Sequence, residues 1–372
     1  MKSLLDLFTL IQLLNTIVKM KAEPNKDPFV TNKILNDILS GKAPTTYEKS
    51  NIKAQIQYNT KIRPVGNTTN DPVYIYTAMS LRQLVSIDEK NQIVTTSFYL
   101  TLVWFDSRLS WNESLYNNCI SITVPASSFW LPDIAILNSA SNSNLISYPN
   151  NLHAIVSNTG GISLTIGLTS QQTRCKMNVR IYPFDTQSCS IVIGTWFHDI
   201  NEVVLNVIPV RDLALQYYQN HTIWDIKSLE FNEIYDSSRF IGANWAINYL
   251  FKINATINVK DLEFNITLKR NPLYIMINGV VPCLLLNAII LIAFSLSFQL
   301  QVNLCKSINI LGLVGLNIKF FLIKFKGMTS FLTFSMNSLR VSADIPVQSE
   351  YLPLITLYML LSMMYTFSGL SW

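Results

Sequence analysis

The distribution of apolar positions divides the chain near Pro272. Between residues 24 and 270, apolar, aromatic and β-branched residues occur in short runs mixed with polar ones. From Leu273 onward the apolar runs become long, and 273–298 contains no charged residue. A charge-free run of this length exceeds the ~20 residues that a membrane-spanning helix needs. The pattern therefore predicts two parts in different solvents.

Short β-like runs dominate the first part. Residues 73–106 contain two runs rich in Val, Ile, Tyr and Thr on either side of the polar turn 88–92, as in an antiparallel hairpin. Similar runs follow at 120–124, 162–168, 189–196 and 203–208. Many short strands joined by polar turns favour a β-sandwich over a helical domain.

The second part predicts helices of membrane length. We expect a first helix at 272–298 and a third at 351–370, both in uncharged runs. Between them, 302–345 is apolar in its first half but carries lysines there. Each lysine at bilayer depth costs about 2.5–3.5 kcal/mol, so this region is either pore-facing or not a simple span.

Composition and sequons indicate which side of a membrane the first part faces. The 372 residues are 49% hydrophobic and 14% charged, and the net charge of +5 forms no dense basic patch, so we expect no nucleic-acid partner. Residues 1–22 begin with a lysine and an apolar stretch that predict a signal peptide, the alternative being an amphipathic leader. Five glycosylation sequons precede Pro272 and none follows it, which favours an extracellular face: Asn67, Asn112, Asn220, Asn254 and Asn265.

Cysteine spacing carries the family resemblance. Cys175 and Cys189 bracket a segment with Tyr182-Pro183-Phe184-Asp185 near its centre. This arrangement resembles the signature of Cys-loop, pentameric ligand-gated ion channel subunits; the alternative is two unrelated cysteines around a proline turn. Supporting segments resemble the same family, closest to its serotonin type 3, nicotinic and zinc-activated group: Trp104–Trp111, Trp130–Asp133, Asn271–Tyr274 and Val281–Cys283.

The resemblance implies a fold and a function. It implies a Cys175–Cys189 disulfide, a mainly β extracellular ligand-binding domain at 23–270, and an α-helical membrane domain at 271–372. It further implies a multi-pass plasma-membrane protein with an extracellular N-terminal domain. A postsynaptic membrane is one location compatible with the resemblance. Such a subunit would join other subunits in a homo- or hetero-pentamer and bind a small-molecule agonist between them. We expect neither an enzyme nor a cofactor, and the channel would conduct cations.

Two aromatic residues match the family's agonist site. Trp196 falls on the position of the central tryptophan of the binding box, and Tyr99 falls where the neighbouring subunit offers an aromatic. Ring faces attract cationic amines. For each residue the alternative is an ordinary sandwich-core aromatic. Leu137 and residues 258–260 depart from the family's aromatic pattern, which puts an aminergic ligand in doubt.

Other candidates concern metal binding and the domain junction. Three histidines are scattered singly and read as ordinary loop residues, without a metal site: His153, His198 and His221. Trp130 and Asp133 read as structural anchors.

Glu89 and Arg270 match an ion pair at the family's domain junction, the alternative being a weak surface salt bridge. Phe184 and Asp185 match the tip of the Cys-loop that meets the linker after the pore helix.

The pore region matches the family only in part. Leu311 aligns with the gate leucine, while Gln301 stands where cation-selective subunits carry glutamate. The pattern then stops, and 315–337 reads as an insertion, either an unusual structure or, as we favour, a misread intron. The chain also ends at the third span, without the expected fourth helix. An alternative function is therefore a non-conducting subunit that acts in assembly or ligand binding.

Overall fold

The computed structural model describes most of the first part of the chain. It covers residues 28–41, 57–64, 71–141, 143–208, 214–236, 258–282 and 353–371, with isolated positions between 284 and 292 and between 328 and 339. Several predicted features lie outside the described residues: the signal peptide 1–22, the sequons Asn67 and Asn254, and the pore residues Gln301 and Leu311. The proposed insertion 315–337 is described only at isolated positions.

The described residues include ten strands. They are β1 (Val73–Asp88), β2 (Ile93–Phe105), β3 (Ser121–Pro125), β4 (Ile134–Ile136), β5 (His153–Ser157), β6 (Gly161–Arg174), β7 (Thr186–Thr195), β8 (Val203–Val207), β9 (Trp224–Asp236) and β10 (Val259–Arg270). The helical elements are α2 (Pro28–Leu39), η1 (Ser107–Leu109), η2 (Glu113–Leu115), η3 (Ala126–Ser128), α5 (Leu273–Ile275), η4 (Met276–Val280) and α8 (Leu354–Ser371).

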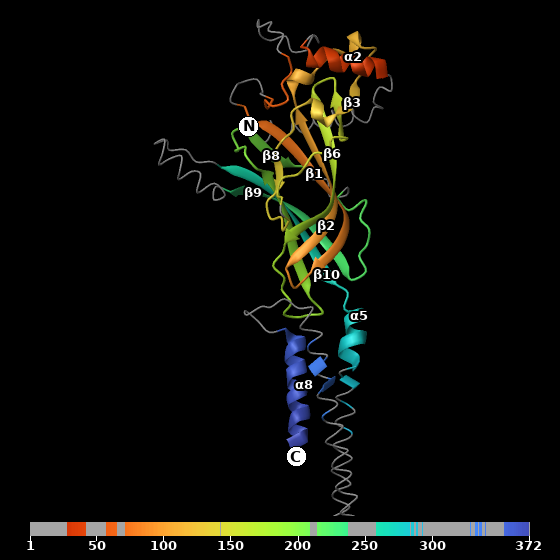
Figure 1. Ribbon diagram of the computed structural model, residues 1–372, viewed down its shortest axis with the longest axis vertical. Helices are drawn as coiled ribbons and strands as arrows, with labels where there is room; N and C mark the ends of the chain where they lie inside the picture. Colours follow the sequence, from red (N-terminus) through yellow and green to blue (C-terminus); the bar gives the residue numbers. More distant parts are fainter. Residues whose placement is uncertain are drawn as a thin grey trace, which may run out of the picture.

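The strands form the predicted sandwich of two sheets (Figure 1). One sheet has the order β3-β5-β6-β2-β1-β8 and the other the order β4-β7-β10-β9. The predicted hairpin is present: β1 and β2 pair antiparallel from Tyr76 opposite Val103 to Asp88 opposite Ile93. Side chains alternate along the strands, and the inward ones include the fully buried Trp104, Phe98 and Phe264. The mainly β extracellular-type fold is therefore confirmed.

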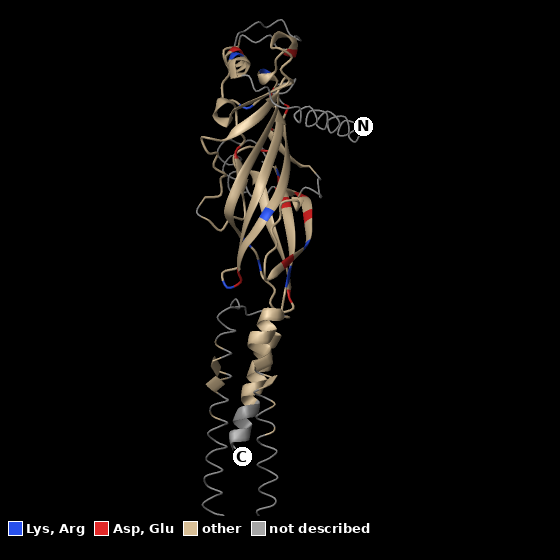
Figure 2. Cartoon of the chain, turned by 90° about the vertical axis from the view of Figure 1, so that its right-hand side faces the viewer, with Lys and Arg blue, Asp and Glu red and all other residues tan. Residues whose placement is uncertain are grey.

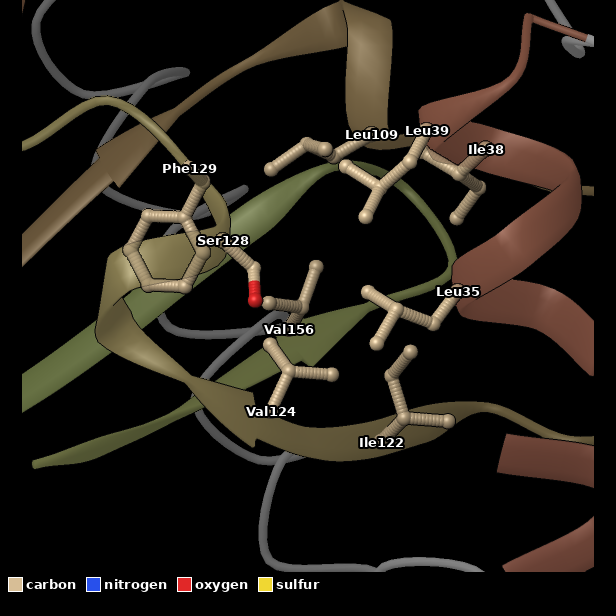
Figure 3. A pocket seen from close by; sticks show the side chains of 9 residues that line it. All are labelled: Leu35, Ile38, Leu39, Leu109, Ile122, Val124, Ser128, Phe129 and Val156. Atoms are coloured by element: carbon tan, nitrogen blue, oxygen red, sulfur yellow. The ribbon is translucent and has the colours of Figure 1, made fainter. Parts of the chain in front are cut away.

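Helix α2 covers one end of the sandwich, next to β3 (Figure 1). Its buried residues recur every four positions at Val30, Ile34 and Ile38, so one face of the helix packs on the strands. Figure 3 shows Leu35, Ile38 and Leu39 pointing toward apolar side chains of β3 and β5. The cavity left between these side chains has a volume of about 10 Å³, which is room for at most one water molecule. This contact is a packed interface rather than a ligand pocket.

Helices α5 and α8 lie at the opposite end of the molecule (Figure 1). Neither contains a charged residue, whereas charges are scattered over the sandwich (Figure 2). Within the part of the chain that the structure describes, no helix has both the length and the apolarity to cross a membrane. The predicted α-helical membrane domain thus stays a prediction.

Candidate functional site

The segment 194–199, called here the Trp196 segment, continues from the end of β7. Asp133 holds it from the neighbouring W-x-P-D motif: its carboxylate accepts hydrogen bonds from the backbone N–H groups of Trp196 (3.1 Å) and Phe197 (2.5 Å). The Asp133 carbonyl accepts a second bond from the Trp196 N–H at 3.0 Å. The indole of Trp196 is half-buried, while Phe197 is 72% exposed. Trp196 therefore sits at the sandwich surface on a fixed backbone.

His198 completes this arrangement. Its Nδ1 lies 2.5 Å from Oδ1 of Asp133, and its ring packs edge-on to Trp130 with centroids 6.2 Å apart. The hydrogen bond with Asp133 raises the pKa of His198, outweighing the opposite effect of burial. Burial alone would raise the pKa of Asp133, but the bonds from His198 and the Phe197 N–H lower it below its ordinary value. The two side chains form an ion pair when His198 is protonated.

Tyr99 lies on the other sheet. It is half-buried in β2, between Ser80 of β1 and Gly167 of β6. The guanidinium of Arg82 lies 5.9 Å from the centre of its ring. Because Trp196 follows β7 and Tyr99 lies on β2, the two candidates are placed on different sheets of the chain. That placement suits a site completed by a second chain.

The β9–β10 hairpin adds a buried cation. Lys260 is 7% exposed, and its ammonium contacts Glu233 Oε2 at 2.9 Å and Asn206 Oδ1 at 2.6 Å. It also lies 5.8 Å from the centre of the Tyr235 ring. Lys260 thereby attaches the strand pair to β8, and the Ile200 N–H, directly after the Trp196 segment, donates to the Asn258 carbonyl at the start of β10, at 2.9 Å. Two of the departures from the family pattern, Asn258 and Lys260, thus make polar contacts.

Arg270 organises the end of the sandwich next to α5. Its guanidinium binds Glu89 Oε1 at 2.7 Å and both oxygens of Asp185, at 2.7 and 3.1 Å. It also stacks on Tyr182 and Trp224, with its central carbon 4.7 and 4.2 Å from the ring centres. Burial alone would lower the pKa of Arg270, but the bonds to Asp185 and Glu89 raise it. The expected contact between Glu89 and Arg270 is present and largely buried.

The Cys175–Cys189 disulfide is confirmed, and the loop it closes includes one buried and one exposed candidate. Asp185 is fully buried and binds Arg270, a partner that the sequence did not indicate. Phe184 is 56% exposed at the surface of the loop. The Arg180 carbonyl accepts a hydrogen bond from the Leu354 N–H, at the start of α8, at 3.1 Å. The loop therefore contacts both the end of β10, which leads into α5, and the start of α8.

The remaining candidates are spread over the surface. The sequon residues Asn112 and Asn220 are exposed, and Asn265 is half-buried in β10. Leu137 donates its N–H to the Val192 carbonyl, next to the β4–β7 pairing. Among the described residues, no group of three or more His, Cys, Asp or Glu side chains could hold a metal ion.

Sequence reasoning missed the pairing of His198 with Asp133. Both residues were read as structural or ordinary, since neither forms a recognised metal or catalytic pattern. One signal was available: Asp133 ends a motif of the family, and His198 lies two residues after the candidate binding tryptophan. Lys260 was likewise noted only as a departure from an aromatic pattern.

Comparisons with known proteins agree with this geometry. The family model of the neurotransmitter-gated ion-channel ligand binding domain matches residues 49–272. The chain is 31% identical, over 84% of its length, to the neuronal acetylcholine receptor subunit beta-2 of Carassius auratus. It is 29% identical, over 83% of its length, to the neuronal subunit alpha-3 of Homo sapiens, and 27% identical, over 82%, to the acetylcholine receptor subunit beta-type unc-29 of Caenorhabditis elegans.

The matched region is a part of each relative. The chain spans 59% of the length of the Carassius auratus subunit and 53% of each of the other two. The family consists of receptors, which agrees with the prediction that the chain is not an enzyme. The matched family, the disulfide and the sandwich lead to one assignment. The chain belongs to the neurotransmitter-gated ion-channel ligand-binding domain family, whose members are subunits of Cys-loop receptors.

Proposed function

We propose that the chain is a subunit of a ligand-gated ion channel that binds its agonist between neighbouring subunits of a pentamer. The single observation that carries this proposal is the arrangement at the Trp196 segment: a half-buried indole on a backbone fixed by Asp133. An aromatic surface on a rigid support provides contact area for a small ligand at low entropic cost. The relatives named above are acetylcholine receptor subunits, which supports the same class of function.

The placement of Tyr99 supports a site between subunits. Trp196 and Tyr99 belong to different sheets, so each would supply one wall of a cleft formed with an adjacent chain. In this arrangement Trp196 of one subunit faces Tyr99 of the next. The partners are other subunits of the same family, in a homo- or hetero-pentamer.

The agonist is a small molecule whose charge the site constrains. The family's aromatic box suits an amine because ring faces attract cations, by about 0.5–2 kcal/mol per contact. In this chain, however, Arg82 lies over the Tyr99 ring and Lys260 over the Tyr235 ring. These internal cations compete with a cationic ligand for the same ring faces. A cationic agonist would therefore depend mainly on Trp196.

Signal transfer would use the Arg270 cluster and the Cys-loop. Glu89, Asp185 and Arg270 join the β1–β2 turn, the loop and the strand that leads into α5. Because the cluster is buried and charge-assisted, its geometry is stiff. A movement of the hairpin would then displace the loop and the exposed Phe184 together. We propose that this coupling acts on a cation-conducting pore formed by 271–372, with Leu311 at the gate and Gln301 at its cytoplasmic end.

Current recording tests the proposal. The full chain is expressed in cells, alone and with a nicotinic partner subunit, and exposed to amines, amino acids, protons and zinc. An agonist-evoked cation current, lost in Trp196→Ala and kept in Tyr217→Ala on the exposed surface, is the expected result. No current with any of these agonists, although native gels show surface pentamers, would contradict the channel function.

A second candidate function is a non-conducting subunit that assembles or binds ligand. The sequence interruption at 315–337 favours it, since the family pattern stops there. Sequencing the transcript across 314–339 distinguishes the two candidates. A transcript without these residues supports the channel, and one that contains them supports the non-conducting subunit.

A further inference from the structure

One carboxylate holds three consecutive residues of the Trp196 segment. Asp133 accepts from the N–H groups of Trp196 and Phe197 and binds the ring of His198. The Thr195 hydroxyl, in turn, donates to the His198 carbonyl at 2.7 Å. The orientation of the indole therefore depends on how firmly Asp133 is held. Of the three groups that bind this carboxylate, the imidazole is the one whose charge changes near neutral pH.

We propose that His198 is a positioning residue for Trp196 and that its imidazolium form holds the Asp133 carboxylate, and with it the Trp196 segment, more firmly than the neutral ring. A charge-assisted hydrogen bond is shorter and about twice as strong as a neutral one. The neutral ring still donates from Nδ1, so the contact weakens at high pH without disappearing. The importance of this device for binding rests on the proposed ligand-binding role of Trp196.

The groups around the pair favour the charged form. Glu202 acts on His198 as a further negative charge, and Arg63 opposes it. On the other side of Asp133, the Tyr148 hydroxyl donates to the Pro132 carbonyl, and burial keeps the pKa of Tyr148 well above its ordinary value. Tyr148 therefore stays neutral across the working range. The Trp130 ring packs nearly perpendicular to the His198 ring, at an interplanar angle of 86°, and carries no charge.

The direction of the pH effect follows from the two displaced pKa values. The pKa of His198 is raised above its ordinary value of about 6.5, and that of Asp133 is lowered. The ion pair is therefore complete at and below about pH 6.5 and is lost as pH rises through the higher pKa of the folded protein. Asp133 remains ionised throughout this range.

Hydrogen–deuterium exchange of the full chain tests the proposal without any ligand. The peptide that contains Trp196 and Phe197 is followed between about pH 6 and pH 8.5, with the intrinsic pH dependence of exchange divided out. We expect its protection to fall roughly fivefold as pH rises, because the charge-assisted bond is replaced by a neutral one. His198→Gln keeps a neutral donor and should show the low value at every pH.

The control is His153→Gln, because His153 is exposed and contacts the Asn151 carbonyl in a distant loop. It should keep the wild-type pH dependence. Protection that does not change with pH in the wild-type chain, or that changes equally in His198→Gln, would overturn the proposal. The wild-type profile decides the matter even if a variant fails to fold. Since no ligand is used, this outcome is independent of the current recordings that test the proposed function.

Discussion

At the scale of single residues, Arg270 has more partners than the sequence motif predicted, which was Glu89 alone. It binds Glu89 from the β1–β2 turn and Asp185 from the Cys-loop, and it stacks on two aromatic rings. All three charged side chains are largely buried, and the one guanidinium is the cation that both carboxylates share away from water. Removing one partner of a buried ion pair leaves the other uncompensated, which is costly.

Arg270→Gln should therefore destabilise the chain strongly. We expect the free energy of unfolding to fall by about 3–5 kcal/mol, because Asp185 is left buried without its cation. Urea unfolding of the full chain followed by tryptophan fluorescence measures the change. The matched control is Lys269→Gln, the exposed neighbour on the same strand, which should change stability by less than about 0.5 kcal/mol. Equal effects of the two variants would contradict the role given to Arg270.

Residue motifs predicted some contacts and not others. The Glu89–Arg270 contact and the disulfide followed from the family pattern, since both join positions within its motifs. The partner of Asp185 did not, because a motif position does not show whether its side chain points inward. His198 and Lys260 were missed for a related reason. Their partners, Asp133 and Glu233, become neighbours only when strands pair, and no local spacing indicates them.

At the scale of elements, the turn between β5 and β6 shows how backbone geometry fixes a strand connection. Gly160 has a φ of +86°, a backbone conformation that residues other than glycine rarely adopt. Its carbonyl accepts from the Asp106 N–H at 2.9 Å, so the turn is attached to the end of β2. A Cβ atom at this position would collide with the Asp106 carbonyl oxygen.

Gly160→Ala should cost about 1–3 kcal/mol of stability, because it combines a strained φ with a backbone collision. The thermal unfolding midpoint of the full chain measures the loss. Gly279→Ala serves as the control and should be neutral or slightly stabilising. Gly279 is at a helical position where an added Cβ would meet no atom within 4 Å outside its own stretch of helix backbone. Loss of stability in Gly279→Ala alone would contradict this view of the turn.

Helix α2 is a second element whose attachment is testable. Ile34 is fully buried, on the face of α2 that also carries the buried Val30 and Ile38. We expect Ile34→Ala to lower the free energy of unfolding by about 2–4 kcal/mol, because it leaves a cavity and removes buried apolar surface. Asn32→Ala, on the exposed face of the same helix, should have little effect. Urea unfolding of both variants gives the comparison, and equal midpoints would argue against a packed helix.

Element prediction from sequence succeeded for most strands with a clear apolar run. The β1–β2 hairpin, β3, β7 and β8 were expected within a few residues, because β-branched runs and polar turns mark their ends, whereas β6 was expected only at 162–168, half of its observed length. Strand β4 has three residues, too few for a period-2 pattern to be seen, and β5 was not expected although it is as long as β3 and β8. Strands β9 and β10 were not among the expected runs, since charged residues such as Lys260 obscure the alternation.

At the scale of the whole molecule, the candidate residues lie in different parts of the sandwich. The end near α5 and α8 carries the Arg270 cluster and the Cys-loop, while Tyr99 lies on β2 in one sheet and Trp196 follows β7 in the other (Figure 1). The fold of the first part was predictable because the family motifs and the strand pattern agree. The arrangement of several chains was not, because the sequence of one chain does not show which of its surfaces meets a second chain.

Photo-crosslinking shows whether Trp196 of one chain faces Tyr99 of the next, as proposed. Tyr99 is replaced by p-benzoylphenylalanine in the full chain, and surface complexes are irradiated and digested for mass spectrometry. We expect a crosslinked dimer in which residue 99 is joined to the peptide carrying Trp196 of a second chain. The same photoprobe at Leu115, exposed in η2, should not give this product. Crosslinks from position 99 only within its own chain, or to a different surface of the second chain, would contradict the claim.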